Sequence, residues 1–288
     1  MSAVLQLVVN GVLAGSVLAL PAIGLTTIFA VLRHLNFALG AHMTIGAFAG
    51  FAANVYWGLP PYLALPFAFV VAGLSGVASD ELALKPLRRY GALTVAIASI
   101  ALGLFLENLV RFFFGNALRS YDIPILRDWT IGPFRVGPQE VQDLAVAAAI
   151  MALLFVFLAA TSLGKRMRAV ADNPTLADIK GIDPERMGRL ANFLGMGLGG
   201  VGGMLLGLAT SVEPELGFNA LLSVFAAAVV GGLGSVPGAV AGALAIGLAE
   251  ELSLLVLPAT YRSAVGFAAI LVVLAFRPRG LLGARTAG

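Results

Sequence analysis

The sequence predicts an all-α, polytopic bundle of transmembrane helices, with about eight to nine spans, some of them broken or re-entrant. Two observations predict this fold. Apolar residues make up 59% of the 288 residues and charged residues only 11%, whereas an ordinary soluble domain is about 25% charged. Uncharged runs also recur at about the 20 residues that a helix needs to cross a bilayer. The composition therefore excludes the soluble, disordered and nucleic-acid-binding classes of protein.

The uncharged runs give the spans in order. Residues 1–32 carry no charge and lack the basic start and cleavage site of a signal peptide, so they are expected to form a retained first span. Residues 34–79 are long enough for two spans, with a turn at 58–61. The remaining expected segments are spans at 92–114, 144–163 and 190–212, a short or re-entrant segment from 216, a full span after a break at 231–238, and a last run at 263–276.

Basic residues gather in three places that the positive-inside rule assigns to the cytoplasm. These are residues 85–89, the stretch 165–189 and the tail with Arg277, Arg279 and Arg285. Nine crossings with the N-terminus outside and the C-terminus inside satisfy this pattern, and residues 115–142 then lie outside. Eight crossings with a re-entrant segment are the alternative.

Glycines recur every four residues at 195, 199, 203 and 207, near the sixth expected span. Residues four apart share a helix face, and small residues there let two backbones approach closely in lipid. The pattern predicts tight helix packing. A face that slides during transport is the alternative.

Few ionisable side chains lie within the apolar runs, and such groups usually face a protein interior or a water-filled path. Glu107 and Glu250 are the acidic candidates, and His42 is a third candidate. Each also has a structural interpretation. Glu107 is expected to pair with Arg111 one helical turn away, Glu250 to make a polar contact between helices, and His42 to be a hydrogen-bonded packing residue.

Two breaks between helices are expected. Asn36 is suited to cap a helix that starts at Phe37, so residues 33–36 would separate two helices. The second break reads GGLGSVPG and lacks the Gly-Lys-Ser/Thr ending of a phosphate-binding loop. Unwound backbone at membrane depth either lines a cavity or is buried in protein, and a purely structural turn is equally compatible. The residues of this break are Gly231, Gly232, Gly234, Ser235 and Pro237.

Residues 162–189 form the most distinctive polar stretch. Asn173 and the proline after it predict a helix start, residues 175–180 can be helical, and Gly181 suits a C-terminal cap. Asp183 then begins the next helix. A short helix held between two spans is expected to dock on a partner, although a solvated connector is the alternative. The apolar residues that it would offer are Ala177 and Ile179.

These motifs together resemble a known family. The chain is similar, over nearly its whole length, to the permease subunits of branched-chain amino acid ABC transporters of the LivH type. The residues that carry the likeness are Asn10-Gly11, Asn36-Phe37-Ala38, Glu107 with Arg111, Ala171-Asp172-Asn173, Gly181-Ile182-Asp183, the run 226–238 and Glu250. One departure is that Leu39-Gly40-Ala41 follows Asn-Phe-Ala, with His42 displaced, where the family usually has His-Gly and an acidic residue.

The resemblance implies one transmembrane permease domain over residues 1–288, with a coupling segment at 162–189, in the inner membrane. It implies three kinds of partner: a second permease chain (a LivM-type paralogue or an identical copy), two cytoplasmic ATPase subunits that hold the ATP and magnesium, and a periplasmic solute-binding protein. This chain would bind no cofactor or metal and would not itself be an enzyme. The solute would be a branched-chain amino acid, or urea, a short amide or another small organic solute.

The resemblance also implies roles for particular residues. Residues expected at the ATPase contact are Arg168, Ala171, Asp172, Asn173, Ala177, Gly181, Ile182 and Asp183. Residues expected on the translocation pathway are Asn36, Phe37, His42, Glu107 and Glu250.

Two rival classes are weighed against this one. An ion-coupled secondary transporter would use Glu107 or Glu250 for its ion and would need no docking helix. A membrane-embedded enzyme is disfavoured, since the chain has two histidines, no cysteine, and neither HExxH nor GxSxG.

Overall fold

The computed structural model describes residues 2–123, 129–131, 134–277 and 280–282. Almost all of this part of the chain is helical, with one short antiparallel hairpin in which Trp129 pairs with Val136. The α-helices and β-strands in chain order are α1 Ser2–Leu32, α2 Leu39–Phe51, α3 Pro61–Ser79, α4 Ala92–Phe114, β1 Trp129–Ile131, β2 Phe134–Val136, α5 Pro138–Ala160, α6 Ser162–Asp172, α7 Pro174–Ile179, α8 Pro184–Ala209, α9 Leu216–Gly231, α10 Val236–Ser253 and α11 Arg262–Phe276.

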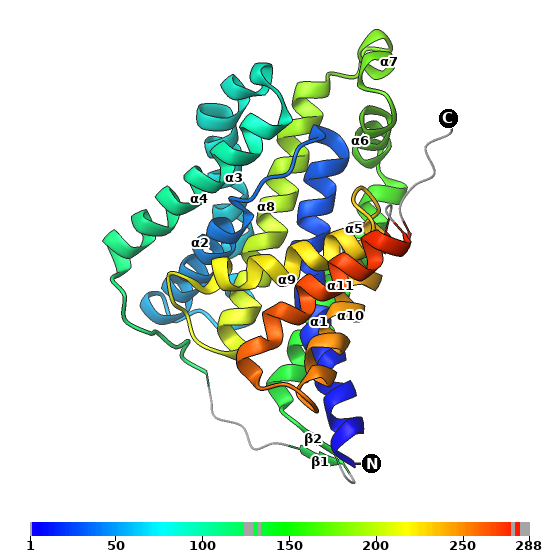
Figure 1. The fold of residues 1–288 in the computed structure, drawn as a ribbon. Coiled ribbons are helices and arrows are strands. Elements are labelled where there is room, and N and C mark those ends of the chain that lie inside the picture. The colour runs from blue at the N-terminus through cyan, green and yellow to red at the C-terminus, as the bar shows by residue number, and fades with distance from the viewer. Residues whose placement is uncertain (1, 124–128, 132–133, 278–279, 283–288) are drawn as a thin grey trace.

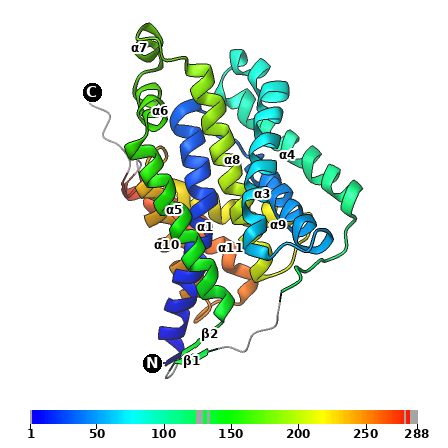
Figure 2. The ribbon, with the colours of Figure 1, turned by 180° about the vertical axis from the view of Figure 1, so that it is seen from behind.

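Helices α1 and α8 stand side by side in the middle of the bundle (Figures 1 and 2). Helices α2, α3 and α4 cover one side, and α5 and α6 cover the other. Helix α7 projects at one end of the molecule, which we call the α7 end, and the β1–β2 hairpin and the N-terminus lie at the opposite end. Helices α9 and α10 pack against α1, and α11 packs against α9 and α10.

The predicted multi-span helical bundle is confirmed. Within the described residues, six helices are long and apolar enough to cross a membrane, and two more apolar helices, Leu216–Gly231 and Ala264–Phe276, are shorter. The run 92–114 is helical over its full predicted length, whereas α5 begins at Pro138, earlier than expected. Its start is fixed by Glu140, whose carboxylate accepts a hydrogen bond from the Gly137 amide at 3.2 Å.

The glycine stripe of α8 is packing surface, as predicted. A Cβ added to Gly203 would collide with the Met43 carbonyl of α2, and one added to Gly195 would collide with Gly24 of α1. Helix α8 therefore touches two neighbours backbone to backbone. Such close contact replaces the hydrophobic driving force that is missing between helices in lipid.

The link between α1 and α2 differs from the expectation in one detail. Helix α2 begins at Leu39 and not at Phe37. The Phe37 amide donates to Ser99 Oγ of α4 at 2.9 Å, and the Asn36 side chain accepts from the Ala38 amide at 3.1 Å. Asn36 thus shapes a tight turn ahead of the helix instead of capping it. Arg33, with φ of 58°, starts this link.

The structure describes only part of the basic C-terminal tail and part of residues 115–142, which are predicted to lie outside. Arg279 and Arg285 lie outside the described residues, as do residues 124–128 and 132–133 of the stretch 115–142. The number of crossings and the side on which each end lies stay predictions.

Candidate functional site

The predicted coupling segment is two short helices with a cap at each boundary. The Thr161 hydroxyl accepts from the Gly164 amide at 3.1 Å where α6 starts, and the Asn173 side chain accepts from the Leu176 amide at 2.9 Å where α7 starts. Gly181, with φ of +80°, ends the turn after α7. The sequence therefore located α7 correctly, because Asn, Pro and Gly each favour one position at a helix end.

Helix α7 has one buried face and an exposed tip. Ala177 is only 4% exposed and packs with Met167 and Val170 of α6 and with α8. This corrects the expectation that Ala177 faces a partner, because a helix of two turns must bury one face to stay attached. Ile179 is 76% exposed and Leu176 is 53% exposed. Leu176 was not among the predicted contact residues, although its position three residues before Ile179, on the same helix face, was the available signal.

Several contacts tie the coupling segment to the bundle. Arg168 donates from Nη1 to the Leu158 carbonyl of α5, and Arg33 donates from Nη2 to the Ala171 carbonyl. Ile182 packs beside the apolar cluster under α7. The Asp183 carboxylate accepts from the Glu185 amide at 2.9 Å and caps α8. The segment is thus attached to α1, α5 and α8.

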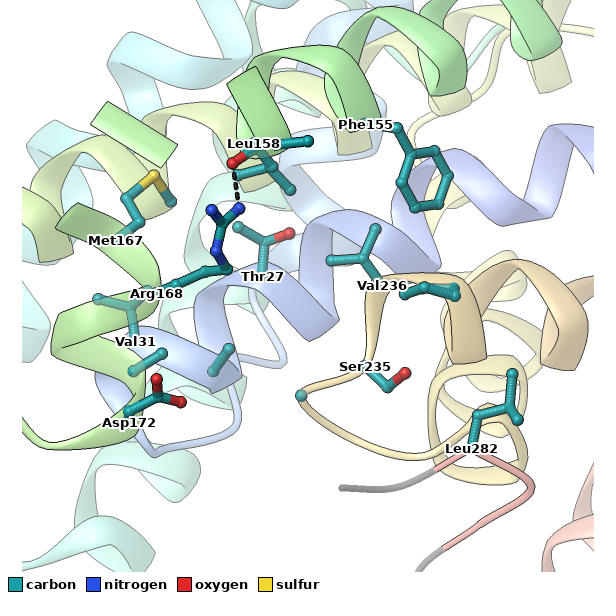
Figure 3. Close-up of a pocket in the computed structure, with 15 residues that line it drawn as sticks. Thr27, Val31, Phe155, Leu158, Met167, Arg168, Asp172, Ser235, Val236 and Leu282 are labelled. Carbon is teal, nitrogen blue, oxygen red and sulfur yellow. Dashed lines mark hydrogen bonds between the residues drawn. The ribbon is translucent and has the colours of Figure 1, made fainter. Parts of the chain in front are cut away.

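Helix α6 also borders a cavity of about 410 Å³, which we call the α6 pocket (Figure 3). Its walls are mostly apolar and come from α1, α5, α6 and the break before α10. Its polar side chains are Thr27, Arg168, Asp172 and Ser235, and Leu282 reaches it from the C-terminal stretch. The pocket therefore lies where the coupling segment meets the helix break.

The predicted break within residues 231–238 is present, and the chain is not helical between α9 and α10. Helix α9 ends at Gly231, α10 begins at Val236, and the Ser235 hydroxyl caps α10 by accepting from the Gly238 amide at 3.2 Å. Gly231 and Gly232 are buried, whereas Gly234 and Pro237 are exposed.

The C-terminal stretch 280–282 lies on this break, which the sequence did not predict. The amide of Leu281 donates to the Val230 carbonyl at 2.8 Å, and the amide of Leu282 donates to the Gly231 carbonyl at 3.0 Å. These bonds satisfy carbonyls that the end of α9 leaves open. No pattern in the tail signals the contact, since two backbone amides make it.

A second cavity, of about 280 Å³, lies between α2, α4 and α9, and we call it the α4 pocket. It is lined by Phe37, Gly40, Ala41, Ile100, Gly103, Leu104, Glu107, Phe218 and Leu221. Phe37 and Glu107, two of the predicted pathway residues, therefore meet in one place. The expected pair of Glu107 with Arg111 is present at 2.6 Å, and Glu215 of the α8–α9 link joins it at 2.5 Å.

The other predicted pathway residues lie elsewhere. Asn36 is buried in the α1–α2 link, next to Phe37. His42 is fully buried, with its ring nitrogens 2.8 Å from the Ala38 carbonyl and 3.0 Å from Ser79 Oγ. Glu250 is buried and accepts from Ser223 Oγ at 2.6 Å. His42 and Glu250 thus make helix-to-helix contacts and line neither pocket.

Nothing in the described part of the chain gathers three or more His, Asp or Glu side chains into a metal-binding group. The two pockets and the coupling segment are accordingly the candidate sites.

Comparison with known proteins places these features in a family. The family described as branched-chain amino acid transport system / permease component matches residues 7–274. The chain is 34% identical to the high-affinity branched-chain amino acid transport system permease protein LivH of Escherichia coli K12, over 97% of this chain and 95% of that protein.

Two less similar relatives are also named as transport permeases. The chain is 30% identical to the high-affinity branched-chain amino acid transport system permease protein BraD of Pseudomonas aeruginosa, over 97% of this chain and 95% of that one. It is 28% identical to the guanosine ABC transporter permease protein NupQ of Bacillus subtilis, over 77% of this chain and 73% of that one. The chain therefore belongs to the branched-chain amino acid transport system permease family, and it is a permease subunit of an ABC importer.

Proposed function

We propose that this permease moves branched-chain amino acids, or a related small polar organic solute, across the inner membrane. A second permease chain would complete the pathway, two ATPase subunits with ATP and magnesium would dock at the α7 end, and a periplasmic binding protein would deliver the solute at the hairpin end. The N-terminus is then periplasmic and the C-terminus cytoplasmic. Residues 1–288 act as one transmembrane domain in this proposal.

The exposed tip of α7 carries the proposal. Leu176 and Ile179 stand out from the bundle at the end where the basic residues gather, while Ala177 anchors the same helix. Large apolar side chains on an otherwise polar projection are typical of an interaction site. Asn173, Gly181 and Asp183 fix the shape of this tip. An ATPase groove is the partner that an importer permease requires there.

Coupling follows from the attachments of the segment. A docked ATPase shifts the permease only if its contacts differ in strength between the two states of the transporter. Any displacement of α7 is carried by the cluster around Ala177 to α6, and Arg168 joins α6 to α5. The α6 pocket leaves room for α6 to move relative to the break at Ser235. A docked ATPase would thus act first on α5 and α8, which contact the segment, and the α9–α10 break lies across the α6 pocket from it.

The solute assignment rests on the relatives. LivH and BraD carry branched-chain amino acids in their names, whereas NupQ is named for guanosine. The identity is higher, and the coverage larger, for the amino acid group. Urea and short amides are the alternative solutes that the sequence left open.

Purification of the tagged chain from its own cells in mild detergent tests the assembly. We expect an ATPase and a second permease chain to co-purify. The double variant Leu176→Ser, Ile179→Ser is expected to lose the ATPase and keep the second permease, because neither side chain supports the fold. Lys180→Ser, on the same helix turn, is the control that should keep both. A wild-type chain that purifies alone, under conditions that hold a known ABC complex together, would overturn the proposal.

A further inference from the structure

The basic side chains at the α7 end fall into two groups. The first group follows α3 or lies on α8, and each of its cations is 2.5 to 3.8 Å from a carboxylate: Lys85, Arg88, Arg186 and Arg189. The second group surrounds α6 and makes no ion pair with any carboxylate of the described residues: Arg33, Lys165, Arg166 and Arg168. Positive charge around α6 is therefore left uncompensated.

Three exposed side chains of the second group, Arg33, Lys165 and Arg168, lie around the α6 pocket, and we call them the basic rim. Arg168 lines the pocket, and Lys165, three residues earlier, shares its face of α6. Arg33 donates to the carbonyl of Ala171, which also lines the pocket. Asp172 is the one carboxylate of the lining, so the basic rim and the pocket together carry a net charge of +2.

Away from the basic rim the α6 pocket is apolar. Its walls include Val31 of α1 and both Phe155 and Leu158 of α5. In Figure 3, Arg168 and Asp172 lie on one side of the cavity and Phe155 lies on the other. The volume of about 410 Å³ falls within the range of ligand pockets, about 300 to 1,000 Å³. A cavity that is charged at one end and apolar at the other suits an amphiphile.

The pocket can be reached from the outer side of α5. Only 17% of the residues in the most apolar window of this span are buried, and Leu153 and Val156 are 70% and 61% exposed. A span with so little burial faces lipid along much of its length. Ala159, in the last turn of α5, is exposed and lines the pocket. The pocket thus lies where a lipid-facing span ends, which is the level of the lipid headgroups.

We propose that the α6 pocket and its basic rim form a binding site for an anionic phospholipid of the cytoplasmic leaflet. The phosphate group lies against Lys165 and Arg168, with Arg33 nearby, and part of one acyl chain enters the pocket beside Phe155 and Leu158. Basic pockets between spans on the cytoplasmic side are suited to anionic headgroups. The bound lipid fills the space between the coupling segment and the α9–α10 break.

Charge decides among the possible occupants. Residues 283–288 of the same chain include Arg285 and no acidic residue, so they would add positive charge to a rim that is already positive. A zwitterionic lipid carries no net charge and gains only the apolar contact. Each Lys or Arg near the membrane surface favours an anionic lipid by about fivefold. A net charge of +2 therefore predicts a preference of about 30-fold for a lipid with one negative charge.

Photo-crosslinking measures this preference. The purified complex of permease chains and ATPases is placed in phosphatidylcholine nanodiscs with a low fraction of probe lipid. The probe is phosphatidylglycerol with a diazirine in one acyl chain, or phosphatidylcholine with the same chain. We define the pocket ratio as the labelling of Val31 and Leu158 by the first probe relative to the second. We expect a pocket ratio of about 30, whereas Leu153 and Val156, on the outer face of α5, should take both probes equally.

High salt should lower the pocket ratio, because exposed charges are screened. Glycerol phosphate, which has the phosphate without acyl chains, should not compete with the lipid probe. A pocket ratio near 1, or effective competition by glycerol phosphate, would overturn the inference.

Charge variants test the basic rim. The double variant Lys165→Gln, Arg168→Gln leaves no net charge at the pocket, so its pocket ratio should fall to about 1. Since Arg168 also holds α6 to α5, Lys165→Gln alone is the gentler test and should lower the ratio about fivefold. The control Arg166→Gln, Lys180→Gln removes the same charge from exposed positions that do not line the pocket. An equal fall in both double variants would mean attraction to the whole surface and would overturn the site.

A second pair of variants tests the apolar part. Ala159→Trp places a large ring in the lining of the pocket, and Ala160→Trp places it at the next residue, which is also exposed but is outside the lining. We expect Ala159→Trp to abolish labelling of Val31 and Ala160→Trp to leave it unchanged. Unchanged labelling in both variants would contradict entry of the acyl chain.

This inference rests on the orientation in the proposed function, but its test does not, because both leaflets of the nanodisc contain the probe. A complex that assembles as proposed and has a pocket ratio near 1 overturns the inference alone. A chain that purifies without an ATPase overturns the proposed function, and a pocket ratio of about 30 in that chain would still support the lipid site.

Discussion

Helices α8 and α5 are both membrane spans by length and composition, yet they occupy opposite environments. In the most apolar window of α8, 78% of the residues are buried in the protein, against 17% for α5. Helix α8 is rich in glycine, whereas α5 exposes large side chains such as Leu153 and Val156. Burying a leucine against another helix gains little over lipid, so small residues that allow close backbone contact mark the inner helix. Side-chain size separates inner from outer helices better than hydropathy does.

The largest effect is expected from a bulky residue in the glycine stripe. Gly203→Leu places its side chain against the Met43 backbone of α2, where there is no free space and no flexible neighbour. We expect loss of the folded protein, seen as aggregation on size-exclusion chromatography in mild detergent. Ala152→Leu on the exposed face of α5 is the control and should elute normally. A normal profile for Gly203→Leu would show that α2 and α8 can separate at little cost.

A smaller loss of stability is expected when one of two adjacent alanines of α5 is replaced by leucine. Ala147 is fully buried, whereas Ala148 is exposed. Ala147→Leu should destabilise the protein by about 1 to 3 kcal/mol, because overpacking forces its neighbours to shift, and Ala148→Leu should have no measurable effect. Thermal unfolding of the two variants in detergent gives the comparison. Equal melting temperatures would contradict the assignment of an inner and an outer face to α5.

The smallest loss of stability is expected from removing one hydrogen bond that joins α5 to α8. Gln139, in the first turn of α5, donates from Nε2 to the Leu208 carbonyl near the end of α8 at 2.7 Å. Gln139→Ala should cost about 1 kcal/mol, which is typical of one hydrogen bond. Gln142→Ala, an exposed glutamine on the same helix, is the control. Matching stabilities of the two variants would mean that the bond adds nothing.

Much of the fold could be predicted from local pattern. Uncharged length located the spans, and Asn173, Gly181 and Asp183 located the ends of α7 and its neighbours, because each of these residues has a strong preference for one position at a helix end. The start of α2 could not be predicted, since it depends on Ser99, which is distant in the sequence. The inward face of Ala177 likewise depends on contacts with α6 and α8.

The candidate sites were predictable in part for the same reason. The pair of Glu107 with Arg111 follows from helix geometry alone. Glu215, which also pairs with Arg111, is 104 residues from it in the sequence and reaches it only through the tertiary fold. His42 and Glu250 drew notice because polar groups are rare in spans, but rarity does not distinguish a pathway residue from a buried contact.

The bonds from residues 281 and 282 to the end of α9 bear on how the protein matures. The carbonyls of Val230 and Gly231 accept from amides about 50 residues further along the chain. Ribosomes deliver the chain from its N-terminus, and early segments begin to fold first. Helix α9 is therefore inserted with part of its last turn unsatisfied. The carbonyls at the end of α9 gain these partners only after residue 282 has left the ribosome. The hydrogen bonding of the α9–α10 break is therefore completed late in assembly.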